Sequence, residues 1–187
     1  MEISQVVNDI RFPFQKSHLD NVHARPFYIS VCIDFYSGFV EMAALASEKL
    51  EDTIEATTKL LLRMQLPEEC IVDNARTFRS EGFKELCLNL GVTLSHTTPR
   101  NNRSNGKVER VNRVIQERLR NLTGNGSIPI FFSITELDTI LSLLSFEINN
   151  TKVKGGFAPN EIIRGTTNNL GLRLPPRFSS SENGDYV

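Results

Sequence analysis

Residues 26–45, "PFYISVCIDFYSGFVEMAAL", restrict the possible folds of this chain more than any other segment. They are rich in β-branched and aromatic residues, and Ser37-Gly38 is the single break. This pattern predicts two antiparallel strands joined by a turn at that break. Short apolar segments and stretches of helical periodicity then alternate along the chain, which predicts an α/β domain with a mixed sheet.

The remaining elements are predicted from residue spacing. Ser47 is expected to cap a helix as its first residue, and Gly91 stands where another helix should stop. Helices are expected over 47–64, 81–92, 107–122 and 131–151, and short strands over 16–22, 69–74 and 92–97. The chain therefore divides into a lead-in (1–15), a core (16–165) and a tail (166–187) whose Asn, Gly, Pro and Ser content predicts an extended or disordered segment.

Composition sets limits on partners and compartment. The chain has 187 residues, of which 40% are hydrophobic and 23% charged, as in a single globular domain. Its net charge of −1 gives no overall attraction to nucleic acid, so binding to DNA would need a local basic patch. No apolar run predicts a membrane-spanning helix, and the N-terminus lacks the pattern of a secretion signal.

The cysteines point to a reducing environment. Cys32, Cys70 and Cys87 are odd in number and form no CxxC pair. We therefore expect an intracellular protein with neither a disulfide framework nor a zinc ribbon.

Residues 103–120, "RSNGKVERVNRVIQERLR", form the local basic segment, with six positive and two negative charges. Their apolar residues step by three or four and predict a buried stripe: Val108, Val111, Ile115, Leu119 and Leu122. A neighbouring face carries Glu109, Asn112, Arg113 and Gln116. On helix chemistry alone, Glu109 would favour the helix dipole and pair with Arg113.

Three carboxylates permit a second interpretation of Glu109. Asp20 belongs to "HLD" on the first strand, Asp73 ends "ECIVD", and 35 residues separate Asp73 from Glu109. Carboxylates at the ends of two strands and one helix could hold two divalent ions, which support in-line displacement at phosphorus. The spacing alone is weak evidence, because such matches arise by chance.

Several motifs in a fixed order carry a family resemblance. They are "VDNARTF", "ELCLNLGV", "TP" and "SNGKVERVNR", with "HLD" and "FYISVCIDFYSGFVE" before them and "INNTKVKGGFAPNEIIRG" after them. Over residues 16–165 the chain resembles the catalytic core of retroviral and LTR-retrotransposon integrases, especially of Gypsy-like elements.

The resemblance implies a fold, a reaction and a site. The fold would be an RNase H-like α/β core with a mixed five-stranded sheet. The reaction would be phosphoryl transfer with two Mg²⁺ or Mn²⁺ ions, first trimming the 3′ ends of element DNA and then joining them to target DNA. The resemblance assigns catalysis and metal binding to Asp20, Asp73 and Glu109.

The resemblance also implies DNA contacts and a mobile segment. Contacts with DNA would come from Lys107, Arg110, Asn112, Arg113 and Gln116, with Asn112 also orienting its neighbours. Residues 98–106, "TPRNNRSNG", would form the mobile catalytic loop with Gly106 as its hinge. The resemblance implies homodimers or higher oligomers that assemble through core helices. Ile54, Leu61 and the helix at 133–148 either offer apolar surface for this assembly or are buried inside the monomer. The expected place of action is the nucleus.

Three neighbouring polar residues are expected to be structural. Asp34, in "CIDFYSG", should hydrogen-bond the turn at Ser37-Gly38. His18 and His23 lie near Asp20 in the sequence but lack the spacing of zinc ligands.

Departures from the family pattern leave other functions open. Ala75 stands where the family has Gly after Asp-Asn, and fits only with a negative φ. The segments "NVHAR" and "RNNRSNG" replace a Gly-Pro connection and a His-Pro-Gln-Ser run, and neither a zinc module before the core nor a basic barrel or chromodomain after it is evident. One alternative is a co-opted, non-catalytic relic that binds DNA or protein. Another is a different nuclease of the same fold, such as a cut-and-paste transposase or an RNase H.

Overall fold

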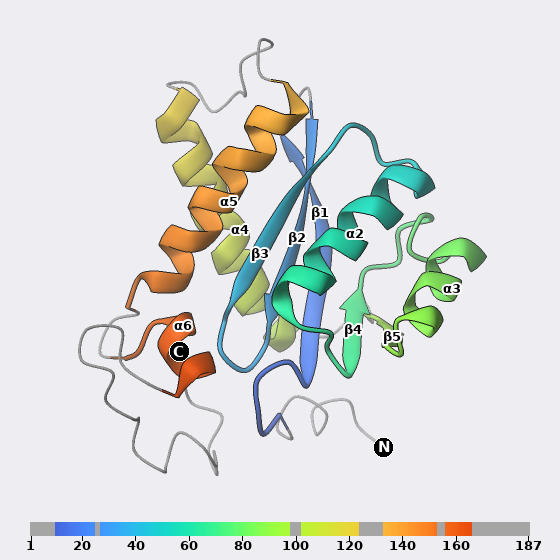
Figure 1. Cartoon of the computed structure of the whole chain (residues 1–187), viewed down its shortest axis with the longest axis horizontal. Helices are drawn as coiled ribbons and strands as arrows, with labels where there is room; N and C mark the ends of the chain where they lie inside the picture. Colours follow the sequence, from blue (N-terminus) through green and yellow to red (C-terminus); the bar gives the residue numbers. More distant parts are fainter. Residues whose placement is uncertain (1–9, 25–26, 98–101, 124–132, 153–155, 166–187) are drawn as a thin grey trace.

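A mixed five-stranded sheet forms the centre of the described chain (Figure 1). The computed structural model describes residues 10–24, 27–97, 102–123, 133–152 and 156–165, without the side chains of 23, 24, 102–107 and 120–123. The strands are β1 (Lys16–Ala24), β2 (Phe27–Asp34), β3 (Val40–Leu45), β4 (Glu69–Val72) and β5 (Thr93–His96), in the order β3-β2-β1-β4-β5. β1, β2 and β3 pair antiparallel, whereas β1–β4 and β4–β5 are parallel. The predicted hairpin and mixed sheet are confirmed.

Helices lie on both faces of the sheet and along one edge (Figure 1). Helices α2 (Leu50–Met64) and α3 (Glu81–Asn89) cover one face, and α4 (Asn102–Thr123) covers the other. Helix α5 (Ile134–Asn150) packs along the edge strand β3, and the short α6 (Pro159–Arg164) contacts α5. None of the helices in the described ranges is long and apolar enough to cross a membrane.

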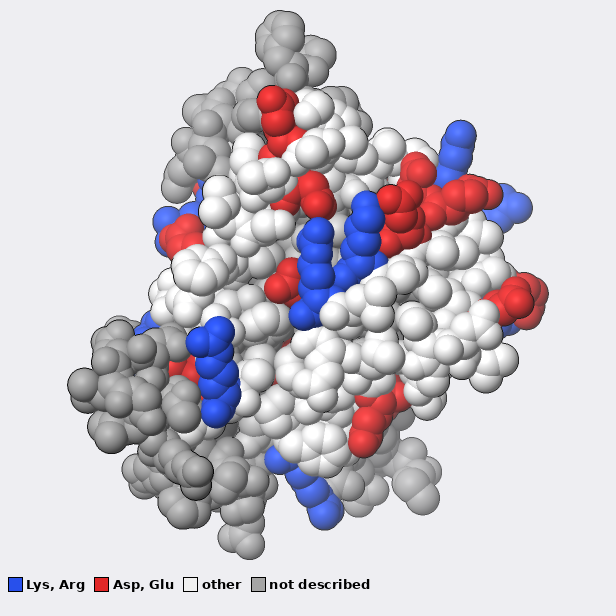
Figure 2. Space-filling model, in the orientation of Figure 1, with Lys and Arg blue, Asp and Glu red and all other residues white. Residues whose placement is uncertain are grey.

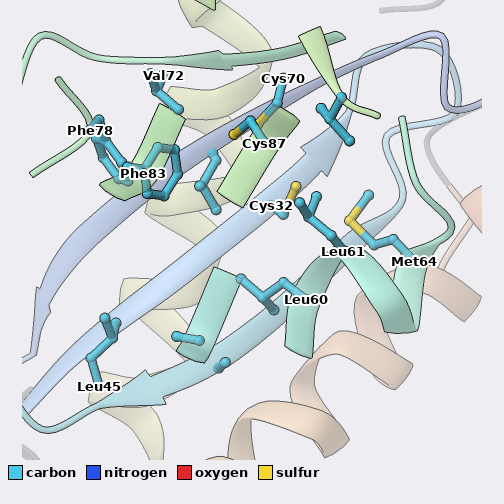
Figure 3. Close-up of a cluster of buried hydrophobic side chains, with 14 of the residues drawn as sticks. Cys32, Leu45, Leu60, Leu61, Met64, Cys70, Val72, Phe78, Phe83 and Cys87 are labelled. Carbon is cyan, nitrogen blue, oxygen red and sulfur yellow. The ribbon is translucent and has the colours of Figure 1, made fainter. Parts of the chain in front are cut away.

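The first hydrophobic cluster lies between the sheet and helices α2 and α3 (Figure 3). It contains all three cysteines, which are free and buried. Burial raises the pKa of the Cys87 thiol to about 11, and burial is also the main cause of the raised pKa values of Cys32 and Cys70. The thiols therefore stay protonated and pack as small apolar side chains among neighbours such as Phe83.

The second cluster lies on the opposite face, under α4 and α5. Val108, Ile115 and Leu119 of α4 are 4%, 0% and 7% exposed, and Val111 is partly buried against them. The apolar stripe predicted for this helix is thereby confirmed for these four residues, while the Leu122 side chain lies outside the described residues.

Two helix starts differ from the sequence prediction. Helix α2 begins at Leu50, because the Ser47 hydroxyl donates to the Asp52 carboxylate at 2.6 Å and does not cap the helix. Helix α4 begins at Asn102, so Gly106 lies inside a helix and not at a loop hinge. The rest of the expected catalytic loop, residues 98–101, lies outside the described residues.

Helix α6 had no counterpart among the predicted elements. Pro159 occupies its first turn, where a missing N–H costs nothing, and Gly165 ends it with a φ of 64°. The buried Glu161 carboxylate accepts from the Ala158 N–H at 2.9 Å and so stabilises the start of the helix.

Asp34 is structural, as expected. It is fully buried, and its carboxylate accepts from the Ser37 N–H at 2.7 Å, the Ser37 hydroxyl at 2.5 Å and the Phe14 N–H at 2.9 Å. Burial raises the pKa of Asp34, while these hydrogen bonds act in the opposite direction. Asp34 therefore holds both the hairpin turn and the lead-in segment.

Two side chains of α5 satisfy backbone groups at the outer edge of β3. Asn149 of α5 accepts from the Val40 N–H and donates to the Val40 carbonyl, both at 2.8 Å. Asp138 accepts from the Ala44 N–H at 3.0 Å and pairs with Arg63 of α2 at 3.3 Å. These contacts occupy backbone groups that a second strand would otherwise pair with.

We expect Asn149→Leu to destabilise the fold by about 2–4 kcal/mol, since it leaves two buried backbone groups of Val40 unpaired. Urea unfolding followed by circular dichroism measures the change. The exposed Thr139→Ala on the same helix is the control, with an expected change within about 0.5 kcal/mol. Equal stability of Asn149→Leu and native protein would contradict this role.

Candidate active site

The register between β1 and β4 brings two carboxylates together. The parallel pairing ends at Leu19 and Val72, so the next residues on the two chains, Asp20 and Asp73, are neighbours. Leu19 and Val72 are buried in the α2/α3 cluster. Because side chains alternate along a strand, Asp20 points to the opposite face, where α4 lies. Asp20 therefore lies in the middle of a long strand and not at a strand end as the sequence had suggested.

The two carboxylates line a pocket of about 240 Å³. Its wall is formed by residues from β1, from the segment before α2 and from the connection between β4 and α3. The lining residues are Asp20, Asn21, Glu48, Asp73, Ala75, Arg76, Thr77 and Phe78. A third acidic residue, Glu48, lines the pocket from the segment after β3, and Thr77 fixes that segment by donating from its hydroxyl to the Glu48 carbonyl at 3.1 Å.

Asp20 sits in an environment that disfavours its charge. Burial raises its pKa, and the nearby negative charge of Asp73 raises it further. The side-chain amide of Asn112 on α4 donates to Asp20 Oδ2 at 3.3 Å and acts in the opposite direction. The Asn112 amide is therefore directed at Asp20, which agrees with the expected orienting role; direct contact of Asn112 with DNA stays a prediction.

Asp73 is held by a local turn. Its Oδ1 accepts from the Ala75 N–H at 2.9 Å. The described non-glycine residues with positive φ are Phe14 and Gln65. Ala75 therefore has the negative φ that an alanine requires at this position. Substitution of the family's Gly by Ala75 leaves this turn intact.

Glu109 lies outside the pocket lining, on the exposed surface of α4. It is three residues before Asn112, which is about 4.5 Å along a helix axis. Within the described residues, no group of three His, Cys, Asp or Glu side chains is arranged to hold a metal ion, and no ion pair joins Glu109 to Arg113. The role of Glu109 as third ligand stays a prediction.

The other expected DNA contacts lie along α4. Arg110, Arg113 and Gln116 are exposed, whereas the Lys107 side chain lies outside the described residues. Within the described chain, Arg110 and Arg113 form no ion pair, in contrast to Arg118, which pairs with Glu147 of α5 at 2.8 Å.

His18 is buried beside the site, and the side chain of His23 lies outside the described residues. The His18 ring packs edge-on against Phe35 with centroids 6.2 Å apart. Burial lowers the pKa of His18 from 6.5 to about 4, and the negative charge of Asp73 only partly offsets this effect. A neutral, packed imidazole fits the structural role expected for it.

The donor set suits a hard divalent cation. Asp20 and Asp73 supply carboxylate oxygens in one pocket, and the Ala75 hydrogen bond engages Oδ1 of Asp73 and leaves Oδ2 for a ligand. Mg²⁺ and Mn²⁺ prefer such oxygen ligands, and a cation would relieve the repulsion that raises the pKa of Asp20.

Comparisons with known proteins agree with this geometry. The family model "Integrase core domain" matches residues 12–102. The Pol polyprotein of feline endogenous virus ECE1 is 30% identical over 143 residues, covering 74% of this chain and 13% of that polyprotein. The Pol polyprotein of radiation murine leukemia virus is 29% identical over 161 residues, covering 83% of this chain and 26% of the relative. The chain thus spans a small part of the polyproteins it matches.

The chain is also similar to a solved structure in three dimensions. The catalytic core domain of BIV integrase superimposes with a TM-score of 0.66 at 26% identity, over 80% of this chain and 93% of that one. This chain contains an integrase core domain of the retroviral type. The HTLV-2 integrase catalytic core, solved as a dimer with magnesium, has the same fold, with a TM-score of 0.63 at 23% identity over 79% of this chain and 94% of that one. The RNase H-like fold expected from the resemblance is confirmed.

Sequence reasoning missed several residues of this integrase core site. Glu48, Arg76 and Thr77 reach the pocket from connections between elements, where periodicity carries no signal. The sequence offered one clue to Arg76 and Thr77, which is that they follow Asp73 closely in the chain. It offered no clue to Glu48.

His18 should make stability depend on pH. Its folded pKa of about 4 lies below the unfolded value of 6.5, so between these values the unfolded state binds more protons and stability falls as the pH falls. The loss between pH 7 and pH 4 should reach about 3 kcal/mol. Urea unfolding of native protein and His18→Leu across this range isolates the contribution, because the two proteins share all carboxylates. Equal pH slopes would contradict the assignment.

Proposed function

We propose that the chain catalyses metal-dependent phosphoryl transfer on DNA: it trims the 3′ ends of element DNA and transfers them into target DNA. The observation that carries this proposal is the β1–β4 register, which sets Asp20 beside Asp73 in a pocket next to the basic helix α4. We further propose that the reaction takes place in the nucleus, where target DNA is found.

The carboxylates would hold the cofactor. In this proposal Asp20, Asp73 and Glu109 would together hold two divalent ions. When bound, such ions supply charge neutralisation at the phosphate and lower the pKa of an attacking water. Asn112 keeps the Asp20 carboxylate in a fixed orientation through its 3.3 Å hydrogen bond. Magnesium bound to the related HTLV-2 core supports this choice of cation.

Helix α4 would hold the DNA. Arg110 and Arg113 are exposed and unpaired within the described residues, and each can contact a backbone phosphate. Gln116 lies three residues after Arg113, about one helical turn, so its side chain can add a hydrogen bond on the same face of α4. The simian T-cell lymphotropic virus intasome, solved in complex with PP2A regulatory subunit B56 gamma, has the same fold, with a TM-score of 0.68 at 20% identity over 88% of this chain and 59% of that one.

We expect Asp20→Asn and Asp73→Asn each to lower Mn²⁺-dependent disintegration of a branched DNA substrate by more than ~100-fold. The loss should exceed the 10–100-fold cost of altering an outer-shell partner, since a ligand itself is changed. Disintegration is the reverse of strand transfer, and it requires the domains that flank the core less than the forward reactions do. Release of the labelled strand measures it. Glu109→Gln tests the predicted third ligand in the same assay.

Glu85→Gln is the matched control, because Glu85 is an exposed acid on α3, away from the pocket. It should keep native activity. A native chain that binds Mn²⁺ but releases no strand, under conditions where an intact retroviral integrase is active, would contradict catalysis by this core. In that case the non-catalytic alternative, a module that binds DNA or protein, would be favoured.

The proposed active form is a homodimer. Exposed apolar side chains gather on the outer surfaces of α5 and α2: Leu143 is 65% exposed, Phe146 68% and Leu62 65%. Figure 2 views the side of α2 and α5, where acidic and basic side chains are interspersed among wide uncharged areas. The HTLV-2 core with the same fold was solved as a dimer, which supports a second copy as the occupant of this surface. Ile54 and Leu61 do not contribute, because Leu61 is buried and Ile54 packs against the first cluster.

Leu143→Glu with Phe146→Glu should convert the dimer to a monomer, since two buried charges would oppose association. Sedimentation velocity measures the state. Leu88→Glu, at a side chain of α3 that is 79% exposed, is the control and should leave the dimer unchanged. A native chain that sediments as a monomer at all concentrations tested would exclude this interface.

A further inference from the structure

We infer that His96 and Asn74 form a reciprocal clamp that positions Asp73, a role that rests on the proposed function of Asp73 as a metal ligand. The clamp joins the ends of β4 and β5. The His96 ring nitrogen Nδ1 lies 3.1 Å from the carbonyl oxygen of Asp73, and the Asn74 side-chain amide donates to the carbonyl of Thr97 at 2.8 Å. Each strand end thus supplies one side chain to the backbone of the other.

The clamp begins where the sheet stops. The last register pair of β4 and β5 is Val72 with His96, and one further backbone bond, from the Thr97 N–H to the Val72 carbonyl at 2.8 Å, extends the ladder. Beyond this point no strand pairing holds Asp73, which follows β4 directly. The two side-chain bonds therefore replace strand pairing at the residue that carries the carboxylate.

The hydrogen bond fixes the tautomer of His96. A carbonyl oxygen can only accept, so Nδ1 must carry the proton and Nε2 of the neutral ring is then bare.

The clamp acts on the carboxylate through the backbone. Oδ1 of Asp73 accepts from the Ala75 N–H, so the direction of the carboxylate depends on the peptide planes on either side of Asp73. His96 holds the carbonyl of Asp73. Asn74, which links Asp73 to Ala75, is itself anchored by the bond from its side chain to the Thr97 carbonyl. Loss of either bond frees a peptide plane next to the carboxylate and lowers the fraction of time in which Oδ2 points into the pocket.

The effect should have the size seen for groups that orient a ligand without touching the metal. Such partners contribute 10–100-fold to metal affinity. His96 and Asn74 are therefore positioning residues in this inference, whereas Asp73 is the ligand.

The test compares His96→Phe with His96→Asn in the full chain. Phe keeps a planar ring but has no donor, while the Asn side-chain amide places an N–H donor on Cγ as Nδ1 does. Isothermal titration calorimetry with Mn²⁺ should show about 10–100-fold weaker binding for His96→Phe and nearly native binding for His96→Asn. Ser95→Ala, next to His96 on β5, should bind as the native chain does.

A second variant covers a possible folding defect of His96→Phe. Asn74→Ala removes the other half of the clamp and leaves His96 in place, and it should weaken Mn²⁺ binding in the same direction. Circular dichroism shows whether each variant is folded before titration.

The outcomes separate the clamp from the proposed function. Native chain that binds Mn²⁺, with folded His96→Phe or Asn74→Ala binding equally well, would overturn the clamp alone. Equal weakening by His96→Phe and His96→Asn would also overturn it, because the donor would then be irrelevant. Native chain that binds no Mn²⁺ would overturn the metal site, and the clamp's role with it. In that case ¹⁵N shifts of the His96 ring would still report whether Nδ1 carries the proton.

Discussion

The parallel pairing of β1 with β4 is the constraint on which the candidate site depends. Parallel neighbours cannot be joined by a tight turn, so the chain returns to β1 only after the β2–β3 hairpin and helix α2 have crossed the sheet. A shift of this pairing by one residue would turn every side chain of one strand to the other face. The burial of Leu19 and Val72 prevents that shift, since it would expose an apolar residue and bury Asp20 or Asp73.

The antiparallel half of the sheet positions the helix that faces this pair. Asn149 and Asp138 bind α5 to the backbone of β3, and the ion pair between Glu147 and Arg118 joins α5 to α4. Helix α4 is thus held by α5 and by its apolar stripe on β2, as well as by Asn112 at the site. An edge strand that could have paired with another chain instead serves as the base for the helices.

The sequence predicted elements that have a strong period or a strong turn signal. The hairpin at Ser37-Gly38 and the apolar stripe of α4 follow from local spacing, and the structure has both. Helix α6 has six residues, too few for a periodic pattern to emerge, and so it was missed. The start of α4 was placed too late because Gly and Asn in 102–106 are weak helix formers, and the contacts of the whole domain outweigh that local preference.

The site was predictable only in part for a related reason. Asp20 and Asp73 could be chosen from the sequence by resemblance, but their adjacency comes from a register between segments more than fifty residues apart, which a local pattern does not encode. Glu48, Asn74 and His96 belong to connections and strand ends, where each contact depends on the tertiary fold. Residues of this kind carry no period, so sequence patterns cannot single them out.

Charge in this molecule acts locally. Burial, followed by the negative charge of Asp73, raises the pKa of Asp20, so the charged form of Asp20 is disfavoured in this pocket. On α4, Arg118 is neutralised by Glu147, which leaves Arg110 and Arg113 as the described unpaired cations of that helix. A net charge of −1 adds no long-range attraction for DNA, and beyond roughly 8 Å salt screens exposed charges at physiological ionic strength. Two described arginines can neutralise only a small number of phosphates, and each phosphate contact adds to the salt dependence of binding. In the proposed function, a bound cation and partner subunits would therefore help to hold DNA at the carboxylate pair.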